Sequence, residues 1–213
     1  MNSYSQANQD LFVSIITNKK NGYFVEIGSN DPIHNNNTYY LEKELNWKGL
    51  MVEYDPTFEP LYKIHRPNSI YIINDARNIN YLKILEFNNF PKNIDYLQID
   101  LDVDNKSTLD VLLSLNSNVF DKYKFATITF EHDIYRGNYF DTQNISRKIF
   151  EYRGYILVFP NVSVFWEGSY KPFEDWYIHP DLVDMNLINK IKTTKSLTSD
   201  QIKEILINIK HFQ

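Results

Sequence analysis

Short apolar runs alternate with amphipathic stretches along the chain. The apolar runs, bounded by polar or turn-forming residues, predict buried strands over residues 22–28, 48–54, 69–74, 94–100 and 125–131. Apolar residues at helical spacing predict helices over 5–18, 36–46, 78–88, 106–116 and 141–152, and a helix or turn over 56–65. Such alternation is typical of a mostly parallel sheet with helices on both faces.

The C-terminal part departs from this alternation. Two apolar runs, 154–159 and 161–166, are separated by Pro160-Asn161 and predict an antiparallel strand pair. Gly154 is placed to end the helix before them. Further helices are predicted over 181–192 and 199–211, the last one opening with the capping box Thr198-x-x-Gln201. Because the chain has no repeat or linker, we expect one domain over residues 1–213, with a seven-stranded sheet.

Composition narrows the classes of function. The formal net charge of −5 disfavours nucleic acid as the main partner, because proteins that bind it usually carry a basic excess. The chain has no cysteine, which excludes disulfides, zinc–thiolate sites and thiol catalysis. No apolar stretch approaches the length of a membrane span, and the N-terminus lacks the pattern of a secretion signal. We therefore expect a cytoplasmic location without a membrane span, and no pattern selects an oligomeric state.

Acidic residues recur where the predicted strands end. They are Glu26, Glu53, Asp75, Asp100, Asp102 and Glu131. Their spacing is that of successive strand–helix units, about 20 to 30 residues, which places them along one edge of the predicted sheet. Ligands of open α/β folds bind at this edge. A row of carboxylates there suits a ligand with hydroxyls and amines rather than one dominated by phosphates.

The loop after the first predicted strand, residues 28–32, is a candidate cofactor loop. Its single glycine, Gly28, lets the chain turn tightly and lets a ligand approach the backbone, although an ordinary strand-to-helix turn has the same pattern. The Gly-x-Gly-x-x-Gly pattern of pyrophosphate sites is missing, which disfavours an NAD-dependent oxidoreductase. Glu53 stands where an acidic residue binds ribose hydroxyls, and Asp75-Ala76 can accept from an adenine amine.

Six segments carry a resemblance to a known family. They are residues 5–10 (SQANQD), 24–30 (FVEIGSN), 37–42 (NTYYLE), 47–53 (WKGLMVE), 94–102 (IDYLQIDLD) and 173–176 (FEDW). Together they resemble the FkbM family of S-adenosylmethionine-dependent O-methyltransferases. The resemblance spans roughly residues 4–180. It implies an α/β, Rossmann-like class I methyltransferase fold, in which a mostly parallel seven-stranded sheet ends in a C-terminal antiparallel strand pair.

The resemblance also implies a set of residues that bind the cofactor S-adenosylmethionine. They are Gln6, Asp10, Glu26, Gly28, Ser29, Glu53, Asp75, Ala76 and Asp100. The residues after the first strand border the methionine part, Glu53 borders the ribose, and Asp75 and Ala76 border the adenine. Gln6 and Asp10 close over the cofactor from the N-terminal segment. The chain departs from the family by lacking a second small glycine after the first strand and by being more acidic after the fourth.

The predicted reaction centre follows the fourth and fifth strands. Asp100, Asp102 and Asp104 alternate in sequence and would share one side of an extended chain, and His132 follows the neighbouring strand. Methyl transfer to an alcohol is an in-line displacement that also needs the hydroxyl proton removed. Asp100, Asp102 and His132 are therefore the candidate catalytic residues, with a carboxylate or the imidazole as general base.

A divalent cation is the alternative to a general base. A bound cation lowers the pKa of the hydroxyl, and carboxylates with an imidazole suit Mg²⁺ or Mn²⁺. Asp102, Glu131 and His132 resemble the metal site of some sugar O-methyltransferases with a related fold. A third interpretation, in which His132 packs under the loop and takes no part in the chemistry, stays open.

Aromatic and polar side chains gather in two segments expected to be acceptor-side loops. The candidate substrate residues are Tyr135, Arg136, Glu174, Asp175 and Trp176. Aromatic faces beside carboxylates suit carbohydrate rings, and a Trp that only covers the sheet is the plainer interpretation. We predict an S-adenosylmethionine-dependent O-methyltransferase that acts on a sugar hydroxyl of a glycan. The alternatives are an NAD-dependent oxidoreductase, a methyltransferase for a non-sugar small molecule or for nucleic acid, and a non-catalytic module.

Overall fold

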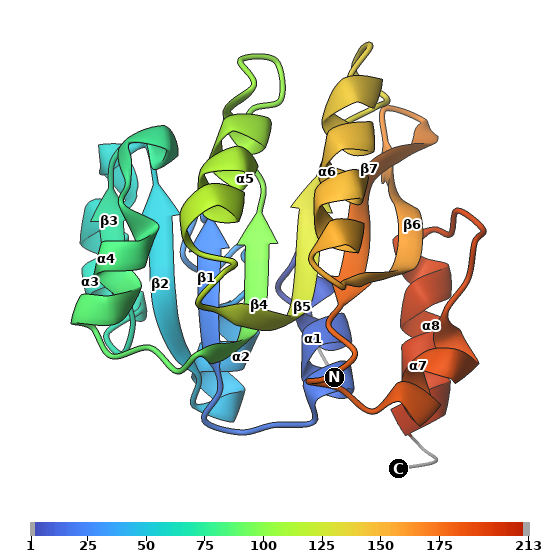
Figure 1. Ribbon diagram of the computed structural model, residues 1–213, viewed down its shortest axis with the longest axis horizontal. Helices are drawn as coiled ribbons and strands as arrows, with labels where there is room; N and C mark the ends of the chain where they lie inside the picture. The colour runs from blue at the N-terminus through green and yellow to red at the C-terminus, as the bar shows by residue number, and fades with distance from the viewer. Residues whose placement is uncertain (1–2, 211–213) are drawn as a thin grey trace.

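Seven strands form one sheet in the computed structural model, which describes residues 3–210 (Figure 1). The strands are β1 (Tyr23–Ile27), β2 (Lys48–Glu53), β3 (Ile70–Ile73), β4 (Asn93–Ile99), β5 (Lys124–Glu131), β6 (Ile156–Trp166) and β7 (Ser169–Ile178). Their order is β3-β2-β1-β4-β5-β7-β6. β1 to β5 pair in parallel, and β7 runs antiparallel between β5 and β6. The expected mostly parallel sheet with a C-terminal antiparallel pair is confirmed.

Helices cover both faces of the sheet. They are α1 (Gln9–Thr17), α2 (Tyr39–Leu45), α3 (Glu59–His65), α4 (Tyr81–Phe87), α5 (Ser107–Asn118), α6 (Phe140–Tyr152), α7 (Met185–Ile191) and α8 (Ser199–Lys210), with the 3-10 helices η1 (Pro56–Phe58) and η2 (Ala76–Asn78). α4, α5 and α6 pack on the face toward the viewer in Figure 1, and the other α-helices pack on the opposite face. None of the helices between residues 3 and 210 has the length and hydrophobicity that crossing a membrane requires.

Alternation along each strand decides which face a side chain joins. In β1, Phe24 packs on the α1 side of the sheet and Val25 on the α5 side. Tyr96 and Leu97 repeat this division in β4. The next β1 residue on the α1 side is Glu26, so this face becomes polar toward the carboxyl ends of the strands.

The C-terminal hairpin differs from the prediction. Pro160 and Asn161 do not separate two strands but lie inside the single long strand β6, at a shift of its register with β7. β6 is an edge strand, where a Pro without an N–H is tolerated. The chain turns instead at Glu167 and Gly168, whose φ angles are 47° and 80°. The prediction of a strand pair divided at Pro160 is therefore wrong in its boundary.

Two predicted helix ends are confirmed. Gln201 donates its backbone N–H to Thr198 Oγ1 at 3.2 Å, and Thr198 donates its own to Gln201 Oε1 at 3.0 Å, which is the reciprocal capping box. Gly154 follows α6 with a φ of 84°, a left-handed conformation that glycine adopts without strain. α8 ends at Lys210, and residue 211 of the predicted helix lies outside the described residues.

Candidate active site

The strand order reverses between β1 and β4, and ligands bind in such sheets at the carboxyl ends of the strands on either side of that point. Gly28 follows β1 there with a φ of 86°. A Cβ on Gly28 would lie 1.7 Å from the Asp100 carbonyl oxygen, so only glycine fits this turn. Ser29, the next residue, is buried and hydrogen-bonds the Tyr62 hydroxyl at 2.7 Å. The predicted tight turn is present and holds the loops after β1 and β4 together.

Glu53 ends β2 next to this turn and is half-buried. One carboxylate oxygen accepts the N–H of Asn30 at 2.6 Å, and the other accepts the N–H of Asp55 at 2.8 Å. A carboxylate offers about four acceptor positions, so these two bonds leave capacity for a pair of ligand hydroxyls. Glu53 is thus fixed in position while it still has room for the predicted ribose contact.

The two predicted adenine residues follow β3. Asp75 accepts the N–H of Arg77 at 2.9 Å and forms an ion pair with its guanidinium at 2.7 Å. These hydrogen bonds lower the pKa of Asp75. Ala76 is buried in the apolar cluster on the α5 side. A ligand at this position would therefore meet Asp75 together with Arg77, with Ala76 forming the wall behind them.

Glu26 lies below the turn and is buried. Its carboxylate accepts the Thr38 hydroxyl at 2.6 Å and the Asn37 N–H at 3.0 Å. Burial raises the pKa of Glu26 to about 7, against the opposing effect of the Arg66 charge. Glu26 therefore anchors the segment that leads into α2, and its predicted contact with the methionine part stays a prediction.

Arg66 is a supporting residue that the sequence does not single out. Its side chain has no exposed surface. It donates to Glu42 Oε2 at 2.9 Å, to Asn36 Oδ1 at 2.8 Å and to Thr38 Oγ1 at 2.6 Å. The same Thr38 binds Glu26, so Arg66 ties α2 and α3 to the loop after β1. A basic residue just after a surface helix is normally solvated, and no local pattern marks this one as buried.

The N-terminal segment folds around Asp10 rather than extending α1. Asp10 accepts hydrogen bonds from the Ser3 hydroxyl at 2.6 Å, the Ser5 hydroxyl at 2.8 Å and the Tyr4 N–H at 2.8 Å. For this reason α1 begins later than the predicted residue 5. Burial raises the pKa of Asp10. Gln6 is exposed within the segment that Asp10 orders.

Asp100 and Glu131 form the centre of the candidate site. They stand at the ends of the neighbouring strands β4 and β5, and their carboxyl groups hydrogen-bond to each other. Burial raises the pKa of Asp100, and burial and repulsion from Asp100 raise the pKa of Glu131 well above its ordinary value. Two carboxyl groups in contact share one proton. Both shifts favour a protonated form of the pair over two separate carboxylates.

A third acid, Glu174, lies directly opposite Glu131 on β7 and has no exposed surface. Burial raises the pKa of Glu174 to about 8, and the charge of Asp100 adds to the effect. Glu174 accepts from Gln9 Nε2 at 2.9 Å and from Trp176 Nε1 at 2.5 Å. The site is therefore closed on one side by α1 and β7, and the contribution of Gln9 was not predicted.

Two buried polar side chains near the pair have unpaired atoms. Asp133 Oδ2 accepts a hydrogen bond from Arg136 Nη1 at 3.1 Å. The other carboxylate oxygen, Oδ1, has no partner within the described part of the chain. Gln98, two residues before Asp100 on β4, has no exposed surface, and neither of its amide atoms is bonded to a described residue. Buried polar atoms are nearly always paired. Gln98 was not among the predicted site residues, although a polar residue inside an apolar strand is a signal that the sequence contains.

His132 does not join the carboxyl pair. It follows Glu131 in the chain, and successive side chains of an extended strand point to opposite faces. His132 is fully buried, with Nε2 3.5 Å from Asp175 Oδ1 and 3.3 Å from Gln143 Nε2. Arg147 also pairs with Asp175, at 2.7 Å. His132 thus belongs to a network under α6, and its catalytic role stays a prediction.

Asp102 lies on an exposed loop beyond the end of β4. Residues 103–106 form a turn, so the alternation predicted for the three aspartates does not continue past the strand. Asp102 Oδ1 accepts the N–H of Asp104 at 3.2 Å. Asp104 in turn accepts the hydroxyl of Tyr139 from the loop after β5. The two loops touch, but Asp102 faces solvent and its catalytic role also stays a prediction.

The structure does not support the predicted magnesium or manganese site. Its three ligands were Asp102, Glu131 and His132. Among residues 3–210, no three His, Cys, Asp or Glu side chains are grouped so that they could hold a metal ion. The physical reason is that Asp102 has left the strand and His132 points away from Glu131.

The predicted acceptor residues divide into loop and strand residues. Tyr135 is half-buried and Arg136 is exposed, both on the loop after β5. Glu174, Asp175 and Trp176 have no exposed surface, because they belong to β7 rather than to a loop. The Trp176 ring lies in the core and offers no face to a sugar. The prediction of an exposed aromatic loop at residues 173–180 is therefore wrong.

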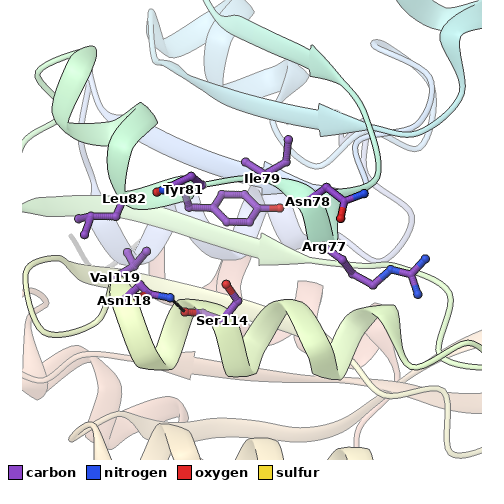
Figure 2. Close-up of a pocket in the computed structure, with 9 residues that line it drawn as sticks. Arg77, Asn78, Ile79, Tyr81, Leu82, Ser114, Asn118 and Val119 are labelled. Carbon is purple, nitrogen blue, oxygen red and sulfur yellow. Dashed lines mark hydrogen bonds between the residues drawn. The ribbon is translucent and has the colours of Figure 1, made fainter.

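A hollow of about 340 Å³ lies between the η2–α4 segment and α5 (Figure 2). Arg77 and Tyr81 line one side, and Ser114 and Asn118 line the other. The hollow lies between helices on the α5 side of the sheet, not at the edge that carries the carboxyl pair. It borders the predicted adenine region through Arg77 and is separate from the predicted reaction centre.

No known protein-family profile matches the chain, and no curated protein sequence matches it. Solved structures do resemble it. A TehB-like SAM-dependent methyltransferase from Corynebacterium glutamicum has a TM-score of 0.52 and 13% identity, over 84% of this chain and 89% of that one. An O-methyltransferase from Bacillus cereus in complex with SAH has a TM-score of 0.52 and 14% identity, over 84% of this chain and 82% of that one.

A third structure, a candidate rRNA methylase from Clostridium thermocellum, has a TM-score of 0.51 and 10% identity, over 84% of this chain and 99% of that one. This chain has the fold of the class I methyltransferases. Its mostly parallel seven-stranded sheet with an antiparallel strand pair at the C-terminal end is as predicted for that fold. Because these methyltransferases differ in the acceptors that their names describe, the fold alone leaves the acceptor open.

Proposed function

We propose that this protein is an S-adenosylmethionine-dependent O-methyltransferase that acts on a sugar hydroxyl of a glycan. The observation that carries the proposal is the hydrogen-bonded pair of Asp100 and Glu131 beside the switch point of a methyltransferase fold. The resemblance of the sequence to the FkbM family supports the same chemistry. The acidic edge and the net charge of −5 favour a hydroxyl-rich acceptor over a phosphate-rich one.

The residues at the switch point fit S-adenosylmethionine. Gly28 has no side chain where its backbone lies against that of Asp100, and Glu53 keeps acceptor positions for ribose hydroxyls. Asp75 lies at the end of the next strand, where the adenine amine is expected. When bound, the cofactor supplies a methyl group on a positively charged sulfur, which is open to attack by an oxygen.

The residues of the chain then have two tasks, to align the acceptor oxygen and to take its proton. Burial raises the pKa of both members of the Asp100–Glu131 pair, and a carboxylate with a raised pKa is a stronger general base. The hydroxyl proton passes to the carboxyl pair and from there to solvent.

Binding of S-adenosylhomocysteine tests the cofactor assignment. At 100 times its Kd, a ligand stabilises the folded state by about 2.7 kcal/mol, which corresponds to roughly 5–10 °C for a chain of this size. Glu53→Ala should reduce this shift, and Glu86→Ala, an exposed acid on α4, should leave it unchanged. No shift at saturating S-adenosylhomocysteine would overturn the assignment, and a shift with NAD(H) instead would favour the oxidoreductase.

Transfer of labelled methyl groups to a panel of glycans, non-sugar alcohols and RNA tests the reaction. Glu131→Gln should lower kcat by roughly 10²–10⁴-fold with little change in cofactor affinity. Asp102→Ala and His132→Ala serve as comparison variants. If these two lose activity while Glu131→Gln keeps it, the catalytic centre is misplaced. Transfer to RNA alone would overturn the glycan assignment, and no transfer to any acceptor would favour a binding module.

A further inference from the structure

The β6–β7 hairpin extends beyond the rest of the sheet. Glu131, the last residue of β5, pairs with Glu174, so the part of β7 before Glu174 extends past the end of β5. This part of β7 continues to pair with β6, up to the Trp166–Ser169 pair next to the turn. Figure 1 shows the turn at the end of the sheet toward which the parallel strands point. The hairpin therefore projects past the edge that carries the carboxyl pair.

Three large aromatic side chains are exposed at the end of this hairpin. Phe165, Trp166 and Tyr170 have 64%, 55% and 50% of their surface exposed. Phe165 and Tyr170 are cross-strand partners whose rings meet edge to face at 5.5 Å. Trp166 is next to Phe165, so its ring lies on the opposite face of the ribbon. We call these three residues the aromatic tip.

The position of the aromatic tip relates it to the proposed reaction centre. Tyr170 is four residues from Glu174 along β7, which corresponds to roughly 13 Å at the rise of an extended strand. The hairpin is also bonded to the loop after β5, because the Phe173 carbonyl accepts the N–H groups of His132 and Asp133 at 2.7 and 3.1 Å. A ligand that touches both the tip and the carboxyl pair must therefore be longer than one sugar ring.

Charge and shape select the kind of ligand. The only charged residues within the hairpin from Phe165 to Lys171 are Glu167 and Lys171, so the tip has no basic cluster for nucleic acid or for anionic lipid. The rings stand on both faces of a narrow ribbon rather than forming one flat patch, which disfavours burial against a second copy of the chain. Exposed rings beside an acidic edge fit a ligand with both C–H surfaces and hydroxyls.

We propose that the aromatic tip is a binding subsite for an extended, uncharged carbohydrate chain, which holds the acceptor glycan while one of its sugars reaches the carboxyl pair. This proposal rests on the proposed function and replaces the predicted contact with Trp176, which is buried. It makes the acceptor a glycan of several sugars rather than a free monosaccharide.

Tryptophan fluorescence provides a direct readout. Of the three Trp residues, Trp47 and Trp176 have no exposed surface, so quenching by acrylamide reports on Trp166. The protein is saturated with S-adenosylhomocysteine and titrated with neutral hexasaccharides of glucose, galactose, mannose, rhamnose and N-acetylglucosamine, and with each monosaccharide. We expect at least one hexasaccharide to protect Trp166 while its monosaccharide does not. Phe165→Ala and Tyr170→Ala should each weaken that binding by roughly tenfold.

Tyr152→Ala is the matched control, because Tyr152 is an aromatic residue with 85% exposure at the far end of α6. It should leave hexasaccharide binding unchanged. Protection by none of the hexasaccharides would overturn the subsite, as would protection by neutral phosphatidylcholine vesicles or by raising the protein concentration alone. Thermal stabilisation by S-adenosylhomocysteine is unaffected by these outcomes, so failure of the subsite is distinct from failure of the proposed function.

Discussion

Replacement of Arg66 by methionine should destabilise the protein severely. The guanidinium is fully buried and gives charge-assisted or neutral hydrogen bonds to Glu42, Asn36 and Thr38 at 2.6–2.9 Å. Methionine fills a similar volume but leaves the Glu42 carboxylate, which is 4% exposed, without its cation. Removal of one partner of a buried ion pair costs about 3–5 kcal/mol. Urea unfolding, analysed by linear extrapolation, measures this loss in the free energy of unfolding.

Lys63→Met is the matched control, because it breaks the ion pair with Glu59 on the same helix, whose side chains are 61% and 42% exposed. Exposed pairs contribute less than about 1 kcal/mol. Adding Glu42→Gln to Arg66→Met should recover part of the loss, because the buried charge left unpaired is then removed. A loss below about 1 kcal/mol for Arg66→Met, or a double variant whose cost is the sum of the single ones, would refute the reasoning.

Three further predictions concern single residues. Burial raises the folded-state pKa of Glu26 from 4.5 to about 7, so the free energy of unfolding should fall by about 3 kcal/mol as pH rises through this range. The urea midpoint should change less between pH 5 and pH 8 in Glu26→Gln than in the wild type. Equal changes in the two proteins would contradict this prediction. Gly28→Ala should lose S-adenosylhomocysteine binding in calorimetry and at least about 1 kcal/mol of stability from its φ of 86°, so wild-type affinity would count against the tight turn. Thr198→Ala should cost about 1 kcal/mol through the lost cap of α8, visible as a lower urea midpoint, and an unchanged midpoint would show that the cap is dispensable.

The parallel strands could be predicted because each is a short apolar run, and all but the half-buried edge strand β3 are buried on both faces. β7 could not, since Glu174 and Asp175 interrupt its apolar pattern and their burial depends on partners far away in the chain, Gln9 and Arg147. The strand boundary predicted at Pro160 was wrong for a related reason. It is a turn residue in most contexts, but an edge strand tolerates it, and only the sheet order reveals which strand is the edge.

The candidate site shows the same division. The row of acids at the strand ends was predictable from spacing, because parallel strands bring their carboxyl ends to one edge. The grouping within the row was not, since a shift of one residue moves a side chain to the other face. Glu131 therefore meets Asp100 while the adjacent His132 joins Asp175. Sequence spacing gave no sign of the buried Arg66 that supports the loop.

The placement of β7 between β5 and β6 affects how the protein matures during synthesis. β7 is the last strand to leave the ribosome, yet β6 reaches the sheet only through it. Glu174 also accepts a hydrogen bond from Gln9, 165 residues earlier. The contact between α1 and β7 can therefore form only after most of the chain has been synthesised. A nascent chain that stops before β7 has every predicted cofactor residue and the Asp100–Glu131 pair, but it lacks Glu174 and the strand that joins β6 to the sheet. Chains truncated before β7 would therefore leave the edge of β5 unpaired, and an unpaired strand edge favours aggregation.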